Sequence, residues 1–174
     1  MNRIDRNHPA PTVNELIGAL QAAVARVLAD ADRLRPEETY RRPGADAWSA
    51  AEILAHLVEM LTYWAEQAQA IAARSQDGEP FGRTQDDPLR IAAVREHARD
   101  DPRELAAGVR ASLDRATALL RSIPDPGWQR TGHHARRGEI TVRQIVQQFL
   151  IEHTEEHAQQ LTAALATPHD VGRG

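Results

Sequence analysis

The stretch VRQIVQQFLIEHTEEHAQQLTAAL, residues 142–165, decides the fold expected of this chain. Its apolar residues recur every three or four positions, which is the period of an amphipathic α-helix. Val146 and Phe149 share one narrow stripe of that helix with His153 and His157. The pattern predicts a long helix whose buried face carries two imidazoles one turn apart.

Three further segments show the same period, so helices are expected at residues 13–34, 50–74 and 102–122. In a capping box, two side chains satisfy the unpaired N–H groups of the first helical turn. This spacing occurs at three of the expected starts: Thr12 with Glu15, Ser49 with Glu52, and Thr141 with Gln144. The remaining start, Asp101-Pro102, has an Asp cap followed by proline at the first helical position.

The connections between these helices are rich in residues that interrupt helices. The longest connection, 75–100, contains Asp87-Pro88, which predicts a short extra helix at about 89–98. No segment reads as a strand. The four amphipathic segments therefore predict an all-α chain folded as a four-helix bundle.

Length and composition narrow the class of protein. With 174 residues, one domain over 1–174 is expected, with its core at about 12–166. The chain has no cysteine and no lysine, which excludes disulfides, thiolate metal sites and Schiff-base chemistry. A net charge of −4 offers no footprint for nucleic acid. Without a membrane-length apolar run or a signal-peptide core, we expect a cytoplasmic protein with no membrane partner.

A third histidine, His56, also faces inward, since it shares one side of the helix at 50–74 with Met60. Solvent exposure is expected for the histidines in termini and connections: His8, His97, His133, His134 and His169. Two interpretations stay open for His56, His153 and His157. They are core histidines paired with polar neighbours, or they are ligands of one divalent metal ion.

Two blocks of the sequence resemble the DinB/YfiT-like metalloenzyme family. The first is WS at 48–49 followed by ILAHL at 53–57, and the second is GEITVR at 138–143 followed by HTEEHAQQL at 153–161. Family members have a Trp-Ser helix start before the first histidine and a His-x3-His pair near the C-terminus. With the helical layout included, the resemblance spans about residues 12–166.

The resemblance implies a four-helix bundle that holds one metal ion on His56, His153 and His157. Zinc and nickel are the usual ions in the family, often with water in the open positions, and homodimers are common. Characterised relatives include metal-dependent S-transferases that use bacillithiol, mycothiol or glutathione, and a thiol-dependent isomerase. The resemblance thus implies a Zn or Ni cofactor, a low-molecular-weight thiol cosubstrate and a small-molecule substrate.

Three functions fit this pattern. A metal-dependent thiol S-transferase is the first, because three histidines with an open position are typical of catalytic zinc and the chain has no thiol of its own. The second is a non-catalytic protein whose metal ties two helices together. The third is a metallopeptidase, since His153-x-x-Glu156-His157 fits H-x-x-E-H. Such peptidases use a further downstream glutamate, which this sequence lacks, so Glu156 is expected to support a ligand or face solvent.

Other side chains are candidates for the walls of a site. Tyr63 and Met60 follow His56 on the same helix and are candidates for a pocket above the metal, with an ordinary core position as the alternative. Arg136, Arg137 and Arg143 suit an anionic thiol, with a solvated surface cluster as the alternative.

Overall fold

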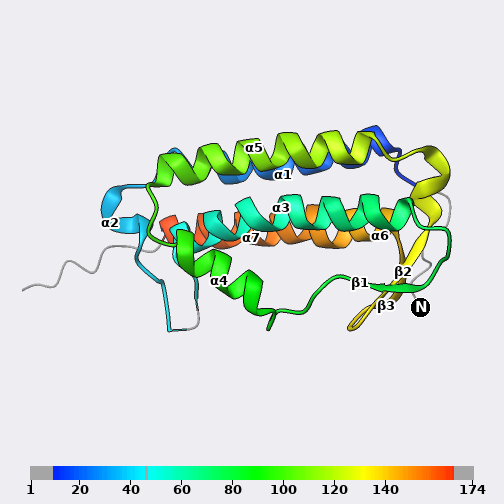
Figure 1. The fold of residues 1–174 in the computed structure, drawn as a ribbon. Helices are drawn as coiled ribbons and strands as arrows, with labels where there is room; N and C mark the ends of the chain where they lie inside the picture. Colours follow the sequence, from blue (N-terminus) through cyan, green and yellow to red (C-terminus); the bar gives the residue numbers. More distant parts are fainter. Residues whose placement is uncertain (1–9, 46, 167–174) are drawn as a thin grey trace, which may run out of the picture.

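Four long helical segments run side by side in the computed structural model, which describes residues 10–45 and 47–166 (Figure 1). The first three are α1 (Val13–Ala31), α3 (Ala50–Ala72) and α5 (Pro102–Arg121). The fourth consists of α6 (Val142–Ile145), the π-helical segment η2 (Val146–Glu152) and α7 (His153–Ala166). The predicted helical bundle is confirmed, whereas His8 and His169 lie outside the described residues.

The capping signals act as predicted from the sequence. Complete capping boxes begin three of the four long segments: Thr12 with Glu15, Ser49 with Glu52, and Thr141 with Gln144. Asp101 caps α5, and Asp87 caps the predicted extra helix, α4 (Pro88–His97). The first helix ends at Ala31 rather than at the predicted 34, and a short helix, α2 (Pro36–Thr39), follows. Proline disfavours helical conformation in the residue before it, and Arg35 is extended.

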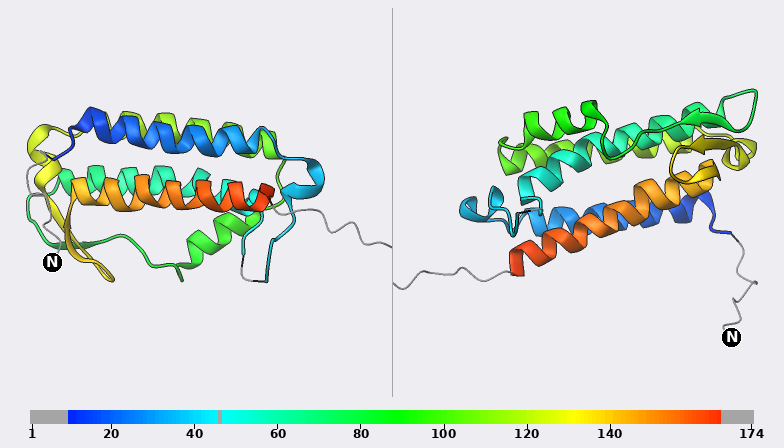
Figure 2. Two further views of the ribbon diagram at one scale, coloured as in Figure 1. Left: turned by 180° about the vertical axis from the view of Figure 1, so that it is seen from behind. Right: turned by 90° about the horizontal axis from the view of Figure 1, so that it is seen from below.

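The connectivity of the bundle places the first two long helices, α1 and α3, on a diagonal. Both α1 and α3 pack against α5 and against the α6–α7 segment, so α1 and α3 lie at opposite corners. The colours of Figure 1 show that α3 and α5, although neighbours, run in the same direction. A parallel pair needs a connection that returns along the whole bundle, and residues 73–101 provide it. Figure 2 shows this segment crossing the outside of α3. The helix α4, which belongs to the segment, packs on α3.

A three-stranded sheet lies at the end of the bundle where α6 begins (Figure 1). The strands are β1 (Glu79–Phe81), β2 (Thr131–His134) and β3 (Gly138–Thr141), and a short 3-10 helix, η1 (Asp125–Gln129), precedes β2. Strand β1 pairs parallel with β2, and β2 pairs antiparallel with β3. The expectation of no strand is therefore wrong. Strands of three or four residues are too short for a period of two to be read from sequence.

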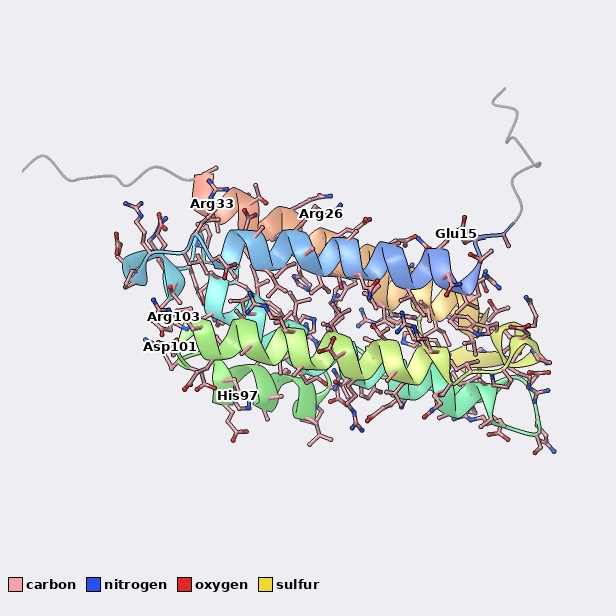
Figure 3. The ribbon with its side chains drawn as sticks, turned by 90° about the horizontal axis from the view of Figure 1, so that it is seen from above. Glu15, Arg26, Arg33, His97, Asp101 and Arg103 are labelled. Carbon is pink, nitrogen blue, oxygen red and sulfur yellow. The ribbon has the colours of Figure 1, made fainter. Side chains whose placement is uncertain are left out.

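Apolar side chains fill the space between the four helical segments. The fully buried ones come from every segment and include Leu20, Val24, Leu57, Leu61, Val109, Leu120, Ile145 and Leu161. Charged side chains lie at the edges, as Figure 3 shows for Arg26 on α1 and for Arg33, which follows α1. Arg26 forms an ion pair of 3.0 Å with Glu155, which links α1 to α7. No helix in the described part of the chain is long and apolar enough to cross a membrane.

Candidate metal centre

Three imidazoles meet between α3 and α7. The Nε2 atom of His153 lies 3.2 Å from Nε2 of His56 and 3.2 Å from Nε2 of His157. His56 and His157 are buried, and His153 is partly open to solvent. The structure therefore brings together the three histidines singled out from the sequence, although His56 is about a hundred residues away from the other two.

The hydrogen bonds made by the Nδ1 atoms of His153 and His157 determine the protonation of the Nε2 atoms that face one another. His153 Nδ1 lies 3.2 Å from a carboxylate oxygen of Glu156, and His157 Nδ1 lies 3.0 Å from the amide oxygen of Gln160. Both partners accept hydrogen bonds, so each Nδ1 carries the proton and each Nε2 presents a lone pair. Two lone pairs 3.2 Å apart repel each other unless a cation lies between them.

The protein environment keeps these imidazoles neutral. Burial lowers the pKa of His56 to about 2 and that of His157 to about 4, with neighbouring histidines and Arg90 acting in the same direction. Burial also lowers the pKa of His153, against an opposing effect from Glu156. Neutral imidazole is the form that binds a metal. At neutral pH, protons therefore do not compete for the Nε2 atoms.

The separations of His153 Nε2 from the Nε2 atoms of His56 and His157 fit a divalent transition metal. An ion with Zn–N distances of about 2.0–2.1 Å holds two nitrogens about 3.4 Å apart in tetrahedral geometry and about 2.9 Å apart in octahedral geometry. The observed 3.2 Å separations lie between these values. Imidazole ligands suit zinc, nickel and copper, and no thiolate is available in this chain. The donor set and its geometry are thus compatible with one ion.

Trp48 forms a wall behind the histidines. Its ring stacks on His157 at 5.7 Å between centroids and meets His56 edge-on at 5.1 Å. The Nδ1 atom of His56 is buried without a hydrogen-bond partner in the described part of the chain. The orientation of His56 therefore depends on packing against this indole rather than on a hydrogen bond. Trp48 lies one residue before the cap of α3, so the capping box also positions this wall.

The π-helical segment η2 ends directly before the first histidine of the pair. A π-helix contains more residues per turn than an α-helix, so it rotates the residues on either side relative to each other. Phe149, inside η2, stacks on Trp64 at 4.2 Å. At the end of η2, Thr154 Oγ1 donates to the carbonyl oxygen of Leu150 at 2.6 Å. A regular helix was the prediction for this stretch, and it is wrong over Val146–Glu152.

Two cavities give access to the histidines. One, of about 390 Å³, lies beside His56 and His153, and the other, of about 500 Å³, lies beside His153 and His157. Gln85, Arg90, His153 and Glu156 line both. An ion on the three Nε2 atoms would have an approach for a small molecule, which is a feature of catalytic rather than closed structural sites.

Comparison with known proteins agrees with this architecture. The family model for the DinB superfamily matches residues 19–161. The chain belongs to the DinB superfamily. It is 26% identical over 141 residues to the uncharacterized protein YuaE of Bacillus subtilis (strain 168), an alignment that covers 74% of this chain and 83% of YuaE.

Solved structures of this fold include proteins with different described activities. YfiT from Bacillus subtilis, described as a probable metal-dependent hydrolase with an unusual four-helix bundle topology, has a TM-score of 0.74 at 15% identity, covering 94% of this chain and 91% of that one. A mycothiol-dependent maleylpyruvate isomerase has a TM-score of 0.63 at 11% identity, covering 89% of this chain and 60% of that one. The colibactin self-resistance protein ClbS, solved with a double-stranded DNA, has a TM-score of 0.65 at 14% identity, covering 92% and 98%.

The exposed histidines of this DinB-superfamily chain lie away from the site. His97, at the end of α4, points outward in Figure 3, and its Nδ1 lies 2.7 Å from a carboxylate oxygen of Asp100. His133 is exposed on β2. Both agree with the prediction from the sequence.

His134 was predicted to be solvated, and this is wrong. It is only 4% exposed and packs among Trp64, Phe81 and Phe149 on the wall of the first cavity. Its Nδ1 accepts from the backbone N–H of Arg136 at 3.3 Å, and its Nε2 lies 3.2 Å from the carbonyl oxygen of Arg83. The parallel pairing of β1 with β2 buries this ring, and that long-range pairing leaves no local signal in the sequence.

Of the residues that the sequence suggested as walls of a site, some line the first cavity and others pack elsewhere. Arg136 and Arg137 line the first cavity, whereas Arg143 donates to the carbonyl oxygen of Pro11 and lies over Trp128. Met60 is fully buried in the core, and Tyr63 packs under Arg83, 3.8 Å from the ring centroid to the guanidinium carbon. Neither lines a cavity; both are packing residues.

Proposed function

We propose that His56, His153 and His157 bind one divalent metal ion, Zn²⁺ or Ni²⁺, and that this DinB-superfamily protein transfers a small-molecule thiol to an electrophile. The observation that carries the proposal is the convergence of three Nε2 atoms. His153 Nε2 lies 3.2 Å from each of the other two, and the lone pairs of His153 and His157 are fixed by Glu156 and Gln160. If the three histidines were core residues that only hydrogen bonded one another, a proton would have to lie between each pair of neighbouring Nε2 atoms. His153 and His157 carry their protons on Nδ1 instead, so no proton is left for the contact between these two rings.

When bound, a divalent ion lowers the pKa of a thiol or water in its open position. The side chains around it have separate roles. Glu156 and Gln160 hold the two ligand rings of α7 in their tautomers, and Trp48 packs on the rings of His56 and His157. In the transfer, the thiol loses its proton to solvent, its sulfur bonds to the electrophilic carbon, and the leaving group departs with the electrons of the broken bond.

A thiol is favoured over water as the nucleophile for two reasons. The solved structures of this fold include a thiol-dependent isomerase, and the chain has no cysteine to supply sulfur itself. Hydrolysis, the activity described for YfiT, is the second candidate, because the same open position would accept water. The peptidase alternative is weaker, since the carboxylate of Glu156 hydrogen bonds a ligand ring instead of standing free as a base.

Metal content measured by mass spectrometry on protein purified without a histidine tag tests the metal site. We expect about one Zn or Ni per chain. A His153→Ala/His157→Ala double variant should contain none, and a His97→Ala/His133→Ala double variant, which removes two exposed histidines, should retain it. Protein that holds no metal and takes none up from solution would refute the proposal.

The reaction itself is tested with the metal-loaded protein, glutathione and an aromatic chloride whose displacement changes its absorbance. Faster transfer than in the double variant supports thiol transfer. Hydrolysis of activated esters without any thiol requirement would favour the hydrolase instead. Full metal occupancy with no change in the spectrum of bound Co²⁺ on adding thiols or anions would indicate a closed, structural ion.

A further inference from the structure

One arginine beside the histidines forms no ion pair in the part of the chain that the structure describes. Arg90, in α4, lines both cavities together with His153 and Glu156. Its guanidinium carbon lies 5.2 Å from the centre of the Trp48 ring, which stacks on His157, and its Nη1 donates to the carbonyl oxygen of Gln85 at 3.0 Å. These contacts hold the guanidinium at the place where the two cavities meet.

Two of the other arginines of the first cavity differ from Arg90 in their partners. Arg83 is almost completely buried and forms an ion pair with Glu59, and Arg136 pairs with Asp86 at 3.4 Å. Arg90 forms no ion pair with any residue in the described part of the chain, and it is only partly exposed. A half-buried guanidinium without a carboxylate leaves directed N–H donors available to a ligand.

Carboxylates near Arg90 act on its charge without forming an ion pair with it. Burial, followed by repulsion from Arg83, lowers the pKa of Arg90, whereas Glu59, Asp87 and Asp86 act in the opposite direction. Glu59 and Asp86 form their ion pairs with Arg83 and Arg136 instead.

The charges around the cavity select the kind of anion. Arg90 is the arginine that lines the second cavity, which is also lined by the carboxylate of Glu156. A phosphate dianion there would face this carboxylate, with one unpaired guanidinium to offset it. A carboxylate carries a single charge, and its two oxygens match the paired N–H groups of one guanidinium. The site therefore suits a carboxylate better than a phosphate.

We infer that Arg90 is a specificity-determining residue that binds the carboxylate of a small-molecule thiol whose sulfur occupies the open position at the histidines. This inference rests on the proposed function and names the class of thiol that it uses. Trp48 and Gln85 position the guanidinium, and the cavity shared by Arg90 and His153 accommodates the chain between sulfur and carboxylate.

The test compares two thiols that differ only in the carboxylate, 3-mercaptopropionate and its amide, 3-mercaptopropionamide. Both are titrated into the Co²⁺-loaded protein, and binding is followed by the near-ultraviolet thiolate-to-cobalt absorption band. We expect the acid to bind about tenfold more tightly than the amide in the unaltered protein. Arg90→Gln should abolish this preference, and Arg90→Lys, which keeps the charge and loses the fork, should retain part of it.

Arg95→Gln is the matched control, because Arg95 lies on the same helix, is exposed and lines neither cavity. It should leave the preference unchanged. Equal binding of acid and amide in the unaltered protein, or a preference that survives Arg90→Gln, overturns the role of Arg90 while the metal site stands.

Failure of the proposed function has a different signature. In that case neither thiol produces the thiolate band, in any variant. The role of Arg90 is then tested by calorimetric titration of propionate into the same proteins. Binding that Arg90→Gln weakens about tenfold and Arg95→Gln does not supports a carboxylate subsite, and binding independent of Arg90 refutes it. Circular dichroism verifies that each variant is folded.

Discussion

The two halves of the bundle bury different chemistry. The α1 and α5 half, the upper layer of Figure 1, contributes only apolar side chains and one threonine to the interior, such as Leu20 and Val109. The lower half, α3 with α6–α7, buries the imidazoles of His56 and His157 and half-buries that of His153. A buried polar ring is costly unless each nitrogen has a partner. The comparison indicates that one half stabilises the fold and the other uses that stability to hold a site.

The largest effect is expected from removing two histidines of the lower half. In the His153→Ala/His157→Ala variant, two of three ligands are lost, and we expect metal affinity to fall by more than about a thousandfold. Competition with a coloured chelator measures it. The apolar half predicts that this variant still folds, with an unchanged helical circular dichroism spectrum. Loss of the fold along with the metal would contradict the division into two halves.

The converse change weakens the upper half. Leu20 is fully buried, and Leu20→Ala should lower the free energy of unfolding by about 3 kcal/mol through lost burial and a residual cavity. Urea denaturation of the metal-free protein measures this loss. Metal affinity at low denaturant should stay within about twofold of the unaltered value. A matched decrease in metal affinity would show that the halves are coupled.

The pH dependence of the metal-free protein sharpens the comparison further. The histidines of the centre have lowered pKa values when folded, whereas an unfolded histidine titrates near 6.5. The unfolded chain therefore binds more protons below that pH. The free energy of unfolding is highest above pH 6.5 and falls as the pH drops toward about 4 for His157 and about 2 for His56.

Urea denaturation between pH 7.5 and 5 in the presence of EDTA measures this decrease, which should be on the order of 1 kcal/mol per pH unit for each of His56 and His157. In the His153→Ala/His157→Ala variant, where only His56 of the cluster remains, the slope should fall to about half or less. This pH range lies above the region in which carboxylates titrate. An unchanged slope would argue against neutral, buried imidazoles.

A smaller effect is expected from removing the side chain that hydrogen bonds a single histidine of the site. Glu156→Ala removes the acceptor of His153 Nδ1 and should weaken metal binding about tenfold. Glu155→Ala is the matched control, since the neighbouring Glu155 instead pairs with Arg26 across the surface. It should leave the affinity unchanged. Equal effects of the two substitutions would mean that general charge, rather than the hydrogen bond, matters.

The smallest effect is expected from removing the ion pair that links the two halves. The Arg26–Glu155 ion pair is largely exposed, at 57% and 41% of the two side chains. Arg26→Gln should change the free energy of unfolding by about 0.5 kcal/mol or less, and the difference should vanish in 1 M salt. Urea denaturation at low and high salt decides this. A larger loss would show that surface charge helps to hold the halves together.

Sequence reasoning predicted the features that are local along the chain. The caps at Thr12, Ser49 and Thr141 lie where the spacing predicted them, since a capping box needs only four consecutive residues. The histidine pair of α7 follows from one helical turn. His56 required the further assumption that two helices face each other, and the structure places it there.

The features that the sequence did not reveal depend on distant contacts. The burial of His134 follows from the pairing of β2 with β1, a strand about fifty residues away. The π-helical segment η2 is likewise a matter of packing, because nothing in VQQFLIE distinguishes it from an α-helix. Arg90 was not identified as a candidate, since its lack of an ion pair is visible only when its neighbours are known.

The parallel arrangement of α3 and α5 has a consequence for how such proteins diversify. Because the connection 73–101 must travel back along the outside of the bundle, it passes the mouth of the site and supplies Arg83, Gln85 and Arg90 to it. The histidines and the apolar core come from the long helices instead. Substitutions in the connection can therefore alter which molecule enters while His56, His153 and His157 stay fixed. A chimera carrying the corresponding connection of a relative should exchange ligand preference and leave the bundle intact.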